Sequence, residues 1–585
     1  MAPKIAFTGP APKLILGIDI GTTFSGMSFC LLEPGKLPEI LPVTRFPAQD
    51  HIGGDSKVPS IIYYDASGRA RAFGAEALQE SVVEQAEEEG WQKAEWFKLH
   101  LRPTGAAIRE DSVPPLPANK NALDVFTDFL RYLFGCAKAY IVDRYPNGNA
   151  RWIGLESTIE YVLTHPNGWS GEQQSKMRSA AIIAGLIPNT LADSERIHFV
   201  TEGEASLNFC ITNGLATDPL RLGKGIIIVD AGGGTVDITA YRQVTTPKGD
   251  SFEEIARPQC LFEGAIFVSE RAHDYLKCKL QGSKYQEDAT HITKCFDKNT
   301  KLRFRSTDAW SYIQFGRPSD KSEEFNITSG RMKLASDIVA GFFKPSLDAI
   351  LRSVTTQCET SEVPISSVLL VGGFAASEWL HSELKKHLNS QNLEVFRPDS
   401  HVNKAVADGA ISFYLEARVS ARISKHTYGI EIITPYTSTN AEHVTRAGTA
   451  FTDVSGVLMV PKKFSAILDK DTRVSATKEF CQSYHQRAHD AASLRAVSLG
   501  VLHYQGEDKN PRWTDIESEN FPVLCTINAD TSEMAKTLEP QQGQSGTYYR
   551  IDFDVVLSFG LTELKAQIAW IENGVEKRGP AQLAY

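Results

Sequence analysis

Two segments of the chain, about two hundred residues apart, share one pattern of apolar and polar positions. Residues 14–25 form an apolar stretch that ends in Asp19 and then enters a Gly/Thr turn, and residues 225–241 repeat this plan with Asp230 before the turn. Apolar runs joined by glycine-rich turns predict β-hairpins, with glycine where the backbone needs positive φ or a close approach. Two such hairpins predict duplicated α/β halves that face one another.

Further elements of an α/β fold follow each hairpin. Residues 161–166 predict a short strand ended by proline, and residues 172–186 carry apolar residues at helical spacing. Residues 368–373 predict a buried strand that runs into a glycine turn, with another amphipathic helix after it. The predicted fold class is therefore α/β.

The texture of the chain changes after about residue 428 to short strands and turns. Apolar residues alternate with mostly polar ones over residues 551–557 and again over residues 564–570, on either side of a turn. This pattern predicts an antiparallel β domain, most simply a sandwich. We expect an α/β domain over residues 14–415 and a β domain over residues 428–585.

Composition narrows the class of protein. At 585 residues the chain is too long for one hydrophobic core, and a net charge of −10 argues against a nucleic-acid binder, which needs a basic face. No apolar run approaches the roughly 18 to 20 residues that span a bilayer, and residues 1–16 lack the features of a signal peptide. The nine cysteines are scattered without a Cys-x-x-Cys pair, which favours free thiols and a cytoplasmic location.

The two predicted turns suggest phosphate chemistry. Glycine turns let backbone N–H groups approach phosphate oxygens closely, and the chain has no P-loop pattern that would bind phosphates in another way. Two such turns are expected to grip the β- and γ-phosphates of one nucleotide from opposite sides. Mg²⁺ keeps several waters and uses one or two carboxylates, so Asp19 and Asp230 at the strand ends suffice to hold it. The pattern predicts a site for ATP or ADP with Mg²⁺.

Five motifs resemble those of the heat-shock protein 70 kDa chaperones, in the same order. Residues 17–23 and 230–237 resemble the two phosphate motifs, residues 371–374 the adenosine motif, and residues 201–205 and 405–410 the connecting segments. The variant of the first motif is most similar to the divergent "family A member twelve" branch and its fungal relatives. The resemblance implies a duplicated actin/hexokinase-like ATPase fold, followed by an antiparallel β-sandwich-like domain.

The resemblance also implies roles for single residues, by position. Lys98, Glu202 and Asp237 are expected to orient a water for in-line attack on the γ-phosphate, and Asp19 and Asp230 to lie at the magnesium. For Lys98 the alternative is a solvated surface lysine beside a buried aromatic residue.

The residues expected to bind the nucleotide come from four segments. Asp297 and Lys301, expected at the ribose and adenine, lie in a segment that departs from the family's Glu-x-x-Lys-Arg pattern. The full set is Gly21, Thr22 and Thr23 in the first turn, Gly232, Gly233, Gly234 and Thr235 in the second, Asp297 and Lys301, and Gly372, Gly373 and Phe374 in the adenosine motif.

The β domain resembles, more faintly, the peptide-binding domain of the same family. Residues 416–425 lack the family's acidic, leucine-rich linker, and the helical lid and acidic tail have no counterpart in the sequence. The resemblance implies unfolded client proteins as partners of this domain, and it names no co-chaperone. The alternative is a β domain that binds something else or only packs on the ATPase.

Three functions fit these observations. The first is a slow, chaperone-like ATPase that switches by rotation of its two halves. The second is an ATP-gated binding or scaffold protein with negligible turnover, suggested by Lys98 and by the altered segment Thr201-Glu-Gly-Glu204. The third is a small-molecule kinase of the same superfold, which needs an acidic base beside a metabolite pocket.

Overall fold

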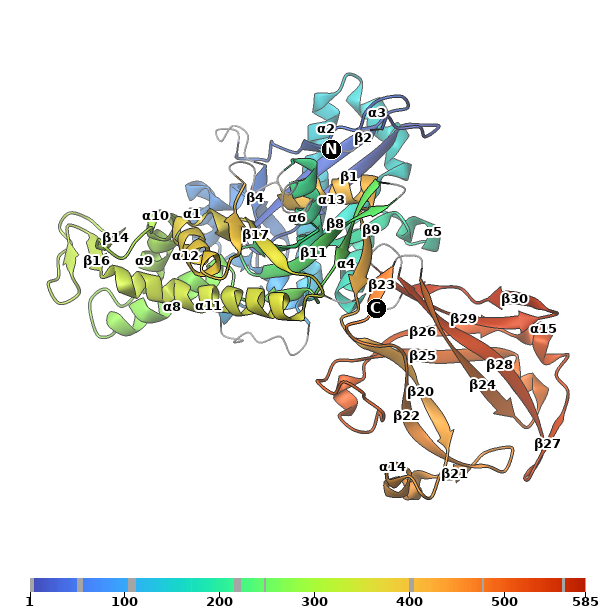
Figure 1. Ribbon diagram of the computed structural model, residues 1–585. Coiled ribbons are helices and arrows are strands. Elements are labelled where there is room, and N and C mark those ends of the chain that lie inside the picture. The colour runs from blue at the N-terminus through green and yellow to red at the C-terminus, as the bar shows by residue number, and fades with distance from the viewer. Residues whose placement is uncertain are drawn as a thin grey trace. The chain divides into compact units, whose positions relative to one another are not determined.

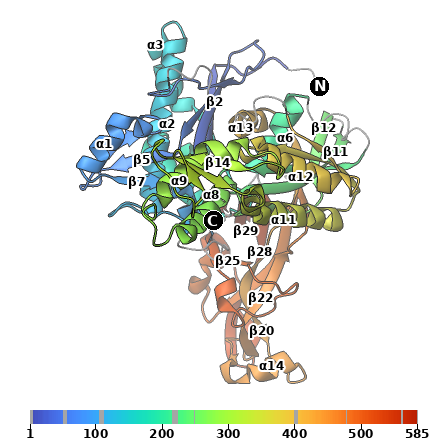
Figure 2. The same cartoon turned by 90° about the vertical axis from the view of Figure 1, so that its left-hand side faces the viewer.

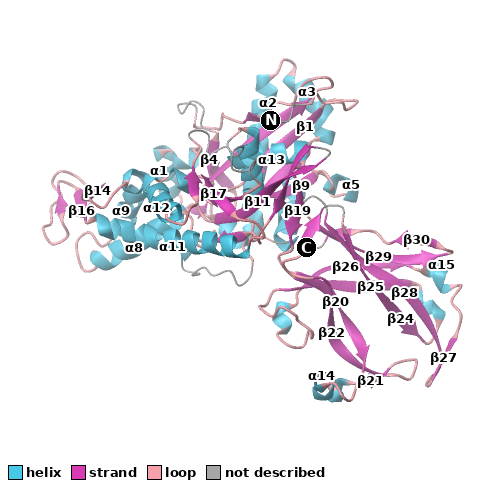
Figure 3. Ribbon diagram, in the orientation of Figure 1, coloured by secondary structure: helices cyan, strands magenta, loops and turns pink. Residues whose placement is uncertain are grey.

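The computed structural model describes residues 5–49, 56–103, 112–169, 171–214, 223–246, 249–398, 405–475, 478–559 and 563–583. The chain divides into two compact units (Figure 1). The α/β unit comprises residues 1–169 and 173–419, and the β unit comprises residues 170–172 and 420–585. Helices lie mainly in the α/β unit, whereas strands dominate the β unit (Figure 3).

The first half of the α/β unit is built on a sheet with strand order β3-β2-β1-β8-β9. Its centre is an antiparallel hairpin, β1 with β2, and β8 and β9 extend the sheet as parallel neighbours. A sixth strand, β4, pairs with β2. The bounds are β1 (Lys13–Asp19), β2 (Phe24–Leu32), β3 (Leu41–Pro42), β4 (Lys57–Pro59), β8 (Glu160–His165) and β9 (Ile197–Thr201).

The second half repeats this sheet. Five strands of its sheet, in the order β12-β11-β10-β17-β18, again have a central hairpin, β10 with β11, and parallel neighbours β17 and β18. The bounds are β10 (Gly225–Ala231), β11 (Val236–Thr246), β12 (Gly249–Glu254), β13 (Gln259–Leu261, paired with β11), β17 (Ile365–Val371) and β18 (Glu394–Phe396). The predicted duplication is confirmed, and the unit has the duplicated actin-like fold.

The main helices also correspond between the halves. In each half, a long helix precedes the first of the two parallel strands, β8 or β17. A second helix joins this strand to the other parallel strand, β9 or β18, and a third helix follows that strand. The first member of each pair is α2 (Ala122–Arg144), α4 (Gly171–Ala184) and α6 (Glu202–Thr212), and the second is α11 (Ser336–Thr360), α12 (Glu378–Asn389) and α13 (Ala405–Glu416). In α2, residues Val125, Phe129 and Leu133 recur at helical spacing and are buried in the first core.

Helices α6 and α13 pack directly on one another between the two sheets (Figure 2). A Cβ at Gly409 in α13 would collide with the carbonyl oxygen of Ala205 in α6, so the close crossing requires glycine there. The hydroxyls of Thr212 and Ser412 hydrogen-bond across the same crossing at 2.8 Å. Because α13 also packs on β1 and β2 while α6 packs on β10 and β11, the crossing joins the two halves.

The β unit contains two antiparallel sheets, with strand orders β21-β22-β20-β25-β26 and β24-β28-β29-β30. Apolar side chains from both sheets, such as Val501, Ile527, Val555 and Ile568, share one core, as a sandwich requires. The bounds are β20 (Thr427–Pro435), β21 (Phe451–Thr452), β22 (Leu458–Leu468), β24 (Glu479–Ala488), β25 (Ala496–Tyr504), β26 (Val523–Asp530), β28 (Gly546–Phe559), β29 (Leu564–Glu572) and β30 (Val575–Arg578). The two alternating runs in the sequence are the paired strands β28 and β29, as predicted.

Two further properties of the described residues concern membrane spans and disulfide bonds. No helix within the described ranges is long and apolar enough to cross a membrane. The nine cysteines form no disulfide in the part of the chain that the structure describes.

Candidate nucleotide site

The two glycine turns lie in direct contact in the α/β unit. A Cβ at Gly233 would collide with the side chain of Thr23, and a Cβ at Gly234 would collide with the side chain of Thr22. The backbone of the second turn therefore lies against the threonines of the first, and only glycine permits this approach. The structure thus brings Thr22, Thr23, Gly233 and Gly234 together at one point.

Each turn is held by hydrogen bonds from outside its hairpin. In the first, Ser60 donates from its hydroxyl to the carbonyl of Gly21 at 2.8 Å and from its backbone to the carbonyl of Thr23 at 2.9 Å. In the second, the amides of residues 264–266 donate to the carbonyls of residues 232–234 at 3.0 to 3.2 Å. These amides open helix α8 (Ala265–Lys279), so α8 starts directly at the second turn.

Two aspartates end the first strands of the hairpins, and both are buried. Asp19 accepts hydrogen bonds from Thr164 on Oδ1 and from the ammonium of Lys57 on Oδ2, each at 2.9 Å. Asp230 accepts a hydrogen bond on Oδ2 from Ser206, the hydroxyl of a residue in α6, at 2.7 Å. The acids expected at the magnesium therefore lie in equivalent places of the two halves.

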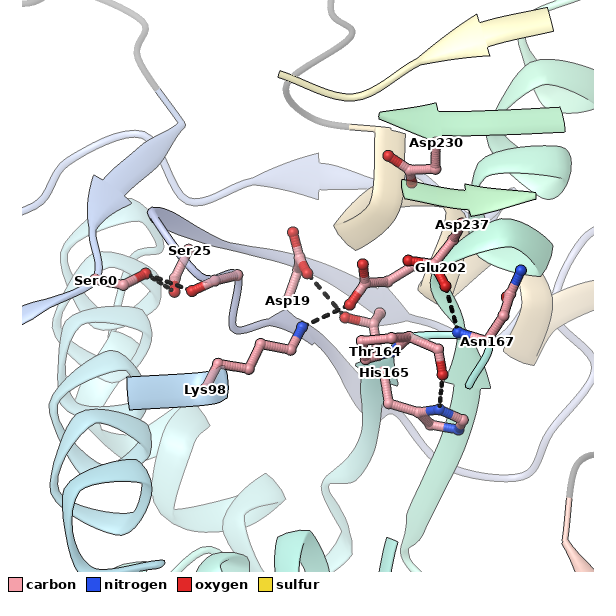
Figure 4. A network of polar contacts seen from close by, with 12 residues as sticks. Asp19, Ser25, Ser60, Lys98, Thr164, His165, Asn167, Glu202, Asp230 and Asp237 are labelled. Atoms are coloured by element: carbon pink, nitrogen blue, oxygen red, sulfur yellow. Dashed lines mark hydrogen bonds and ion pairs between the residues drawn. The ribbon is translucent and has the colours of Figure 1, made fainter. Parts of the chain in front are cut away.

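Lys98 is a buried site residue. It lies in a short 3-10 helix, Phe97–Leu101, that follows β7 (Gln92–Glu95), and its side chain is 5% exposed. Its ammonium donates to Oε1 of Glu202, the first residue of α6, at 2.5 Å and lies 5.6 Å from the ring centroid of Trp169 (Figure 4). The alternative of a solvated surface lysine is therefore wrong.

Asp237 in β11 is tied to the end of β8 in the other half (Figure 4). Its Oδ1 accepts a hydrogen bond from the backbone N–H of Asn167 at 2.6 Å. Its Oδ2 is buried and has no hydrogen-bond partner among the described residues. A buried carboxylate oxygen that lacks a donor fits a site that receives a water molecule.

The acids do not share the available positive charge equally. Burial opposes the charge of Asp19, yet Lys57 and Lys98 hold its pKa below the ordinary value. Burial and the neighbouring Glu202 raise the pKa of Asp230 to about 7 and that of Asp237 well above its usual range. An added cation would favour the ionised forms of these acids.

The residues expected at the nucleoside gather against α8. Lys301 donates to the hydroxyl of Ser269 at 3.1 Å and to the carbonyl of Ala265 at 3.3 Å, and it forms an ion pair with Asp297. Ser269 also donates to Asp297 at 2.5 Å. Because α8 begins at the second turn, Asp297 and Lys301 lie on the same side of that turn.

The adenosine motif is divided between the site and the core. Gly372 has φ +91°, and a Cβ there would collide with Oδ1 of Asp230, so this turn lies directly beside the acid. Gly373 follows in the same turn. The ring of Phe374, however, is 4% exposed and stacks on Phe343, 6.1 Å between centroids, in the core of the second half. Any contact of Phe374 with a nucleotide would have to use its backbone.

Comparison with known proteins gives consistent relatives, although no family model matches the chain. The chain is 22% identical to heat shock 70 kDa protein 12A of Mus musculus, over 94% of the chain and 89% of that protein. It is 23% identical to heat shock 70 kDa protein 12B of Homo sapiens, over 72% of the chain and 71% of that protein. The chain is a divergent relative of the heat shock 70 kDa proteins. The chaperone protein DnaK of Buchnera aphidicola is also 23% identical, over 90% of the chain and 79% of that protein.

A cavity in this heat-shock-70-like chain opens where the two turns meet. It joins one threonine of each turn to Lys98 and to an aromatic wall. The lining residues are Thr22, Lys98, Leu99, Arg102, Pro166, Trp169, Thr235 and Phe262. Thr235 thus shares a cavity with Thr22, which belongs to the opposite half.

The residues present fit a hydrated magnesium bound with a nucleotide. Within the described ranges, no group of three or more His, Cys, Asp or Glu side chains is arranged to hold a metal ion alone. Magnesium takes much of its coordination from water and phosphate oxygens, so Asp19 and Asp230 need only contact its waters. The buried Oδ2 of Asp237 agrees with a site that is completed by water.

Several residues of the site were missed by sequence reasoning. Thr164 lies one residue before the end of β8, the strand parallel to β1, so the strand pattern and the topology together could have pointed to it. Lys57 and Asn167 come from segments with no phosphate signal of their own, and Ser206 lies inside a helix. Only the folded arrangement brings these three to the acids.

Proposed function

We propose that this protein binds ATP with Mg²⁺ between the two halves of its α/β unit, hydrolyses it slowly, and changes the closure of the halves with nucleotide occupancy. The observation that carries the proposal is the contact of Thr22 with Gly234 and of Thr23 with Gly233, beside the buried pair of Lys98 and Glu202. The relatives support it, because they are heat shock 70 kDa proteins and a chaperone protein.

The chain's own groups have distinct tasks in this proposal. The glycine amides and threonine hydroxyls of the two turns bind phosphate oxygens, and the halves must separate to admit them because the turns now touch. Magnesium, when bound, neutralises charge on the β- and γ-phosphates. Lys98 directs its ammonium at the γ-phosphate, and Oδ2 of Asp237 accepts a hydrogen bond from the attacking water.

Two further recognition tasks are assigned to other parts of the chain: recognition of the nucleoside and binding of client proteins. Lys301 and Asp297 contact the base and the ribose, which makes adenine nucleotides the preferred ligands. The β unit binds partly unfolded client proteins, as the similarity to chaperones over 90% or more of the chain suggests. The absence of disulfides among the described residues fits a cytoplasmic setting.

The experiment measures ATP binding by calorimetry and phosphate release under the same conditions. Wild-type protein is expected to bind ATP in the presence of Mg²⁺ and to release phosphate slowly. Lys98→Ala should lower the release rate by at least about 100-fold, because it removes a cation at the developing charge. Lys344→Ala, which removes an exposed ion pair with Asp348, is the matched control and should change neither. If the wild-type protein binds no ATP in the presence of Mg²⁺, the proposal is contradicted.

A second candidate is ATP binding without turnover, in a gated binding protein. The observation that favours it is the 2.5 Å pair of Lys98 with Glu202, which holds the ammonium on a carboxylate and not on an open phosphate site. The same experiment separates the two candidates. Calorimetric binding without phosphate release over hours would select the second.

A further inference from the structure

Lys57 contacts Asp19, the last residue of β1, from a strand that lies two places away in the sheet. In the sheet, Lys57 of β4 pairs with Gly26 of β2, and Gly26 pairs with Asp19 of β1. The three residues therefore lie in one line across three neighbouring strands. The ammonium of Lys57 donates to Oδ2 of Asp19 at 2.9 Å, with only 20% of the lysine side chain exposed.

The stem of Lys57 runs along Gly26 on its way to Asp19. A Cβ at Gly26 would lie 3.5 Å from Cγ and 3.8 Å from Cε of Lys57, so the lysine stem passes directly over the bare backbone of β2. The tightest contact of such a Cβ would be with the carbonyl oxygen of Ser56, at 3.1 Å. Lys57 therefore approaches Asp19 across the backbone of β2 at Gly26.

The ammonium of Lys57 faces the acids of both halves. Besides Asp19, it interacts electrostatically with Asp230 and Glu202. The other oxygen of Asp19 accepts a hydrogen bond from the neutral hydroxyl of Thr164, so Lys57 is the cation that pairs with this acid. The ammonium lies against Asp19 and acts electrostatically on Asp230, the two acids assigned above to the waters of a magnesium ion.

We propose that Lys57 is the resident counter-ion of the metal site, which holds Asp19 when magnesium is absent and which magnesium must displace. This inference rests on the proposed function, since it concerns the metal that accompanies ATP. Two cations held beside the same carboxylate repel each other, even when one of them is hydrated. Lys57 therefore weakens the binding of magnesium, and it stabilises the metal-free site by pairing with Asp19.

The test is the magnesium dependence of ATP binding in Lys57→Met, which removes the charge and keeps the stem. Calorimetry with ATP is repeated over a series of Mg²⁺ concentrations, and again in EDTA. The half-saturating Mg²⁺ concentration should fall roughly tenfold in Lys57→Met, because the competing cation is gone. ATP binding in EDTA should weaken in this variant, because the triphosphate then meets the charge of Asp19 without its counter-ion. Without nucleotide or metal, Lys57→Met should melt at a lower temperature than wild type, and Mg²⁺ should restore part of the difference.

Two further variants separate charge from shape. Lys57→Arg keeps a cation and should keep the wild-type magnesium dependence; a shift like that of Lys57→Met would overturn the inference. Lys120→Met is the matched control, because Lys120 pairs with Asp128 at 3.0 Å with a similar side-chain exposure of 17% but lies outside the site. It should leave the magnesium dependence unchanged.

The outcomes distinguish this inference from the proposed function. Equal magnesium dependence in wild type and Lys57→Met, with ATP bound by both, would overturn the inference alone. Failure of both to bind ATP at every Mg²⁺ concentration would overturn the proposed function. If Lys57→Met does not fold in EDTA, refolding with Mg²⁺ and ATP should rescue it, since the metal replaces the counter-ion, and failure of that rescue contradicts the inference.

Discussion

The backbone N–H of Asn167 donates to Oδ1 of Asp237 at 2.6 Å, and so links the end of β8 in one half to β11 in the other. The side chain of Asn167 extends this link, because its Nδ2 donates to the hydroxyl of Thr239 at 2.8 Å. One residue of the first half therefore orients an acid assigned to the attacking water in the second. Rotation of the halves would change this orientation directly.

Asn167→Ala is expected to loosen the link without removing an acid. Loss of the bond to the buried Thr239 should lower the free energy of unfolding by about 1–3 kcal/mol, and it should lower phosphate release more than ATP binding. Thermal melting and single-turnover hydrolysis measure the two effects. Asn213→Ala removes a side-chain bond from the C-cap residue of α6 to the carbonyl of Phe209 and is the control. Equal effects of the two variants on hydrolysis would contradict a role for the link.

A second prediction concerns the contact between the turns. Gly233→Ala places a methyl group in the space of the Thr23 side chain, so the turns must move apart. We expect a lower melting temperature and weaker ATP binding, both partly recovered in the double variant Thr23→Ala/Gly233→Ala, because the second change removes the atoms that collide. Melting curves and calorimetry are measured on wild type, Thr23→Ala, Gly233→Ala and the double variant. This double-mutant cycle gives the coupling free energy between residues 23 and 233.

The control for this cycle is Gly341→Ala. Gly341 lies in the second turn of α11, and nothing stands within 4 Å of the position its Cβ would take. Alanine is favoured over glycine in a helix by about 1 kcal/mol, so this variant should be neutral or more stable. A purely additive cycle for Thr23 and Gly233 would show that the turns do not touch in solution.

The two hairpin turns could be predicted from sequence because their signals are local. Asp19 and Asp230 end apolar strands, and the glycines follow at once, so the repeat is visible without any knowledge of the fold. The presence of two such hairpins then predicted the duplication. The alternation of apolar and polar residues in β28 and β29 was an equally local signal, since each strand of this antiparallel pair shows the two-residue period of a half-buried strand.

The partners of these acids could not be predicted in the same way. Lys57 approaches Asp19 only because β4 pairs with β2, and Asn167 approaches Asp237 only because the halves close on each other. Neither segment carries a pattern that specifies such a contact. Phe374 shows that a motif alone does not fix where a side chain points. This motif position was expected at the nucleotide, but its ring packs in the core.

A third prediction tests the nucleoside side of the site. Lys301→Met should weaken ATP binding about tenfold, which equals about 1.4 kcal/mol, and leave the maximal rate of phosphate release nearly unchanged. The reason is that Lys301 contacts α8 and Asp297 and none of the acids beneath the turns. Lys386→Met, at an exposed position of α12, is the control. A loss of rate with unchanged affinity would place Lys301 in hydrolysis instead.

The β unit carries its own dependence on pH, through two neighbouring histidines. The rings of His426 and His503 lie 4.9 Å apart, and Nε2 of His503 is 2.6 Å from the side-chain amide of Gln505. Burial lowers the pKa of His503 to about 4 and that of His426 to about 3. The folded unit therefore keeps both imidazoles neutral at pH values where exposed histidines in the unfolded chain are protonated.

The sign of the resulting effect follows from this difference. For a histidine whose pKa is lowered on folding, the stability is fully present above the unfolded value near 6.5 and is lost as the pH falls toward 4. The shift of His503 corresponds to about 3 kcal/mol over this range. Urea unfolding of the full chain, followed by hydrogen exchange of peptides from β25 and β28, should show the loss between pH 7 and pH 4.5. His503→Phe keeps a ring but does not titrate, so its loss should be smaller. His387→Phe, on the exposed side of α12, should behave as wild type, and an unchanged pH profile in His503→Phe would exclude His503 as the cause.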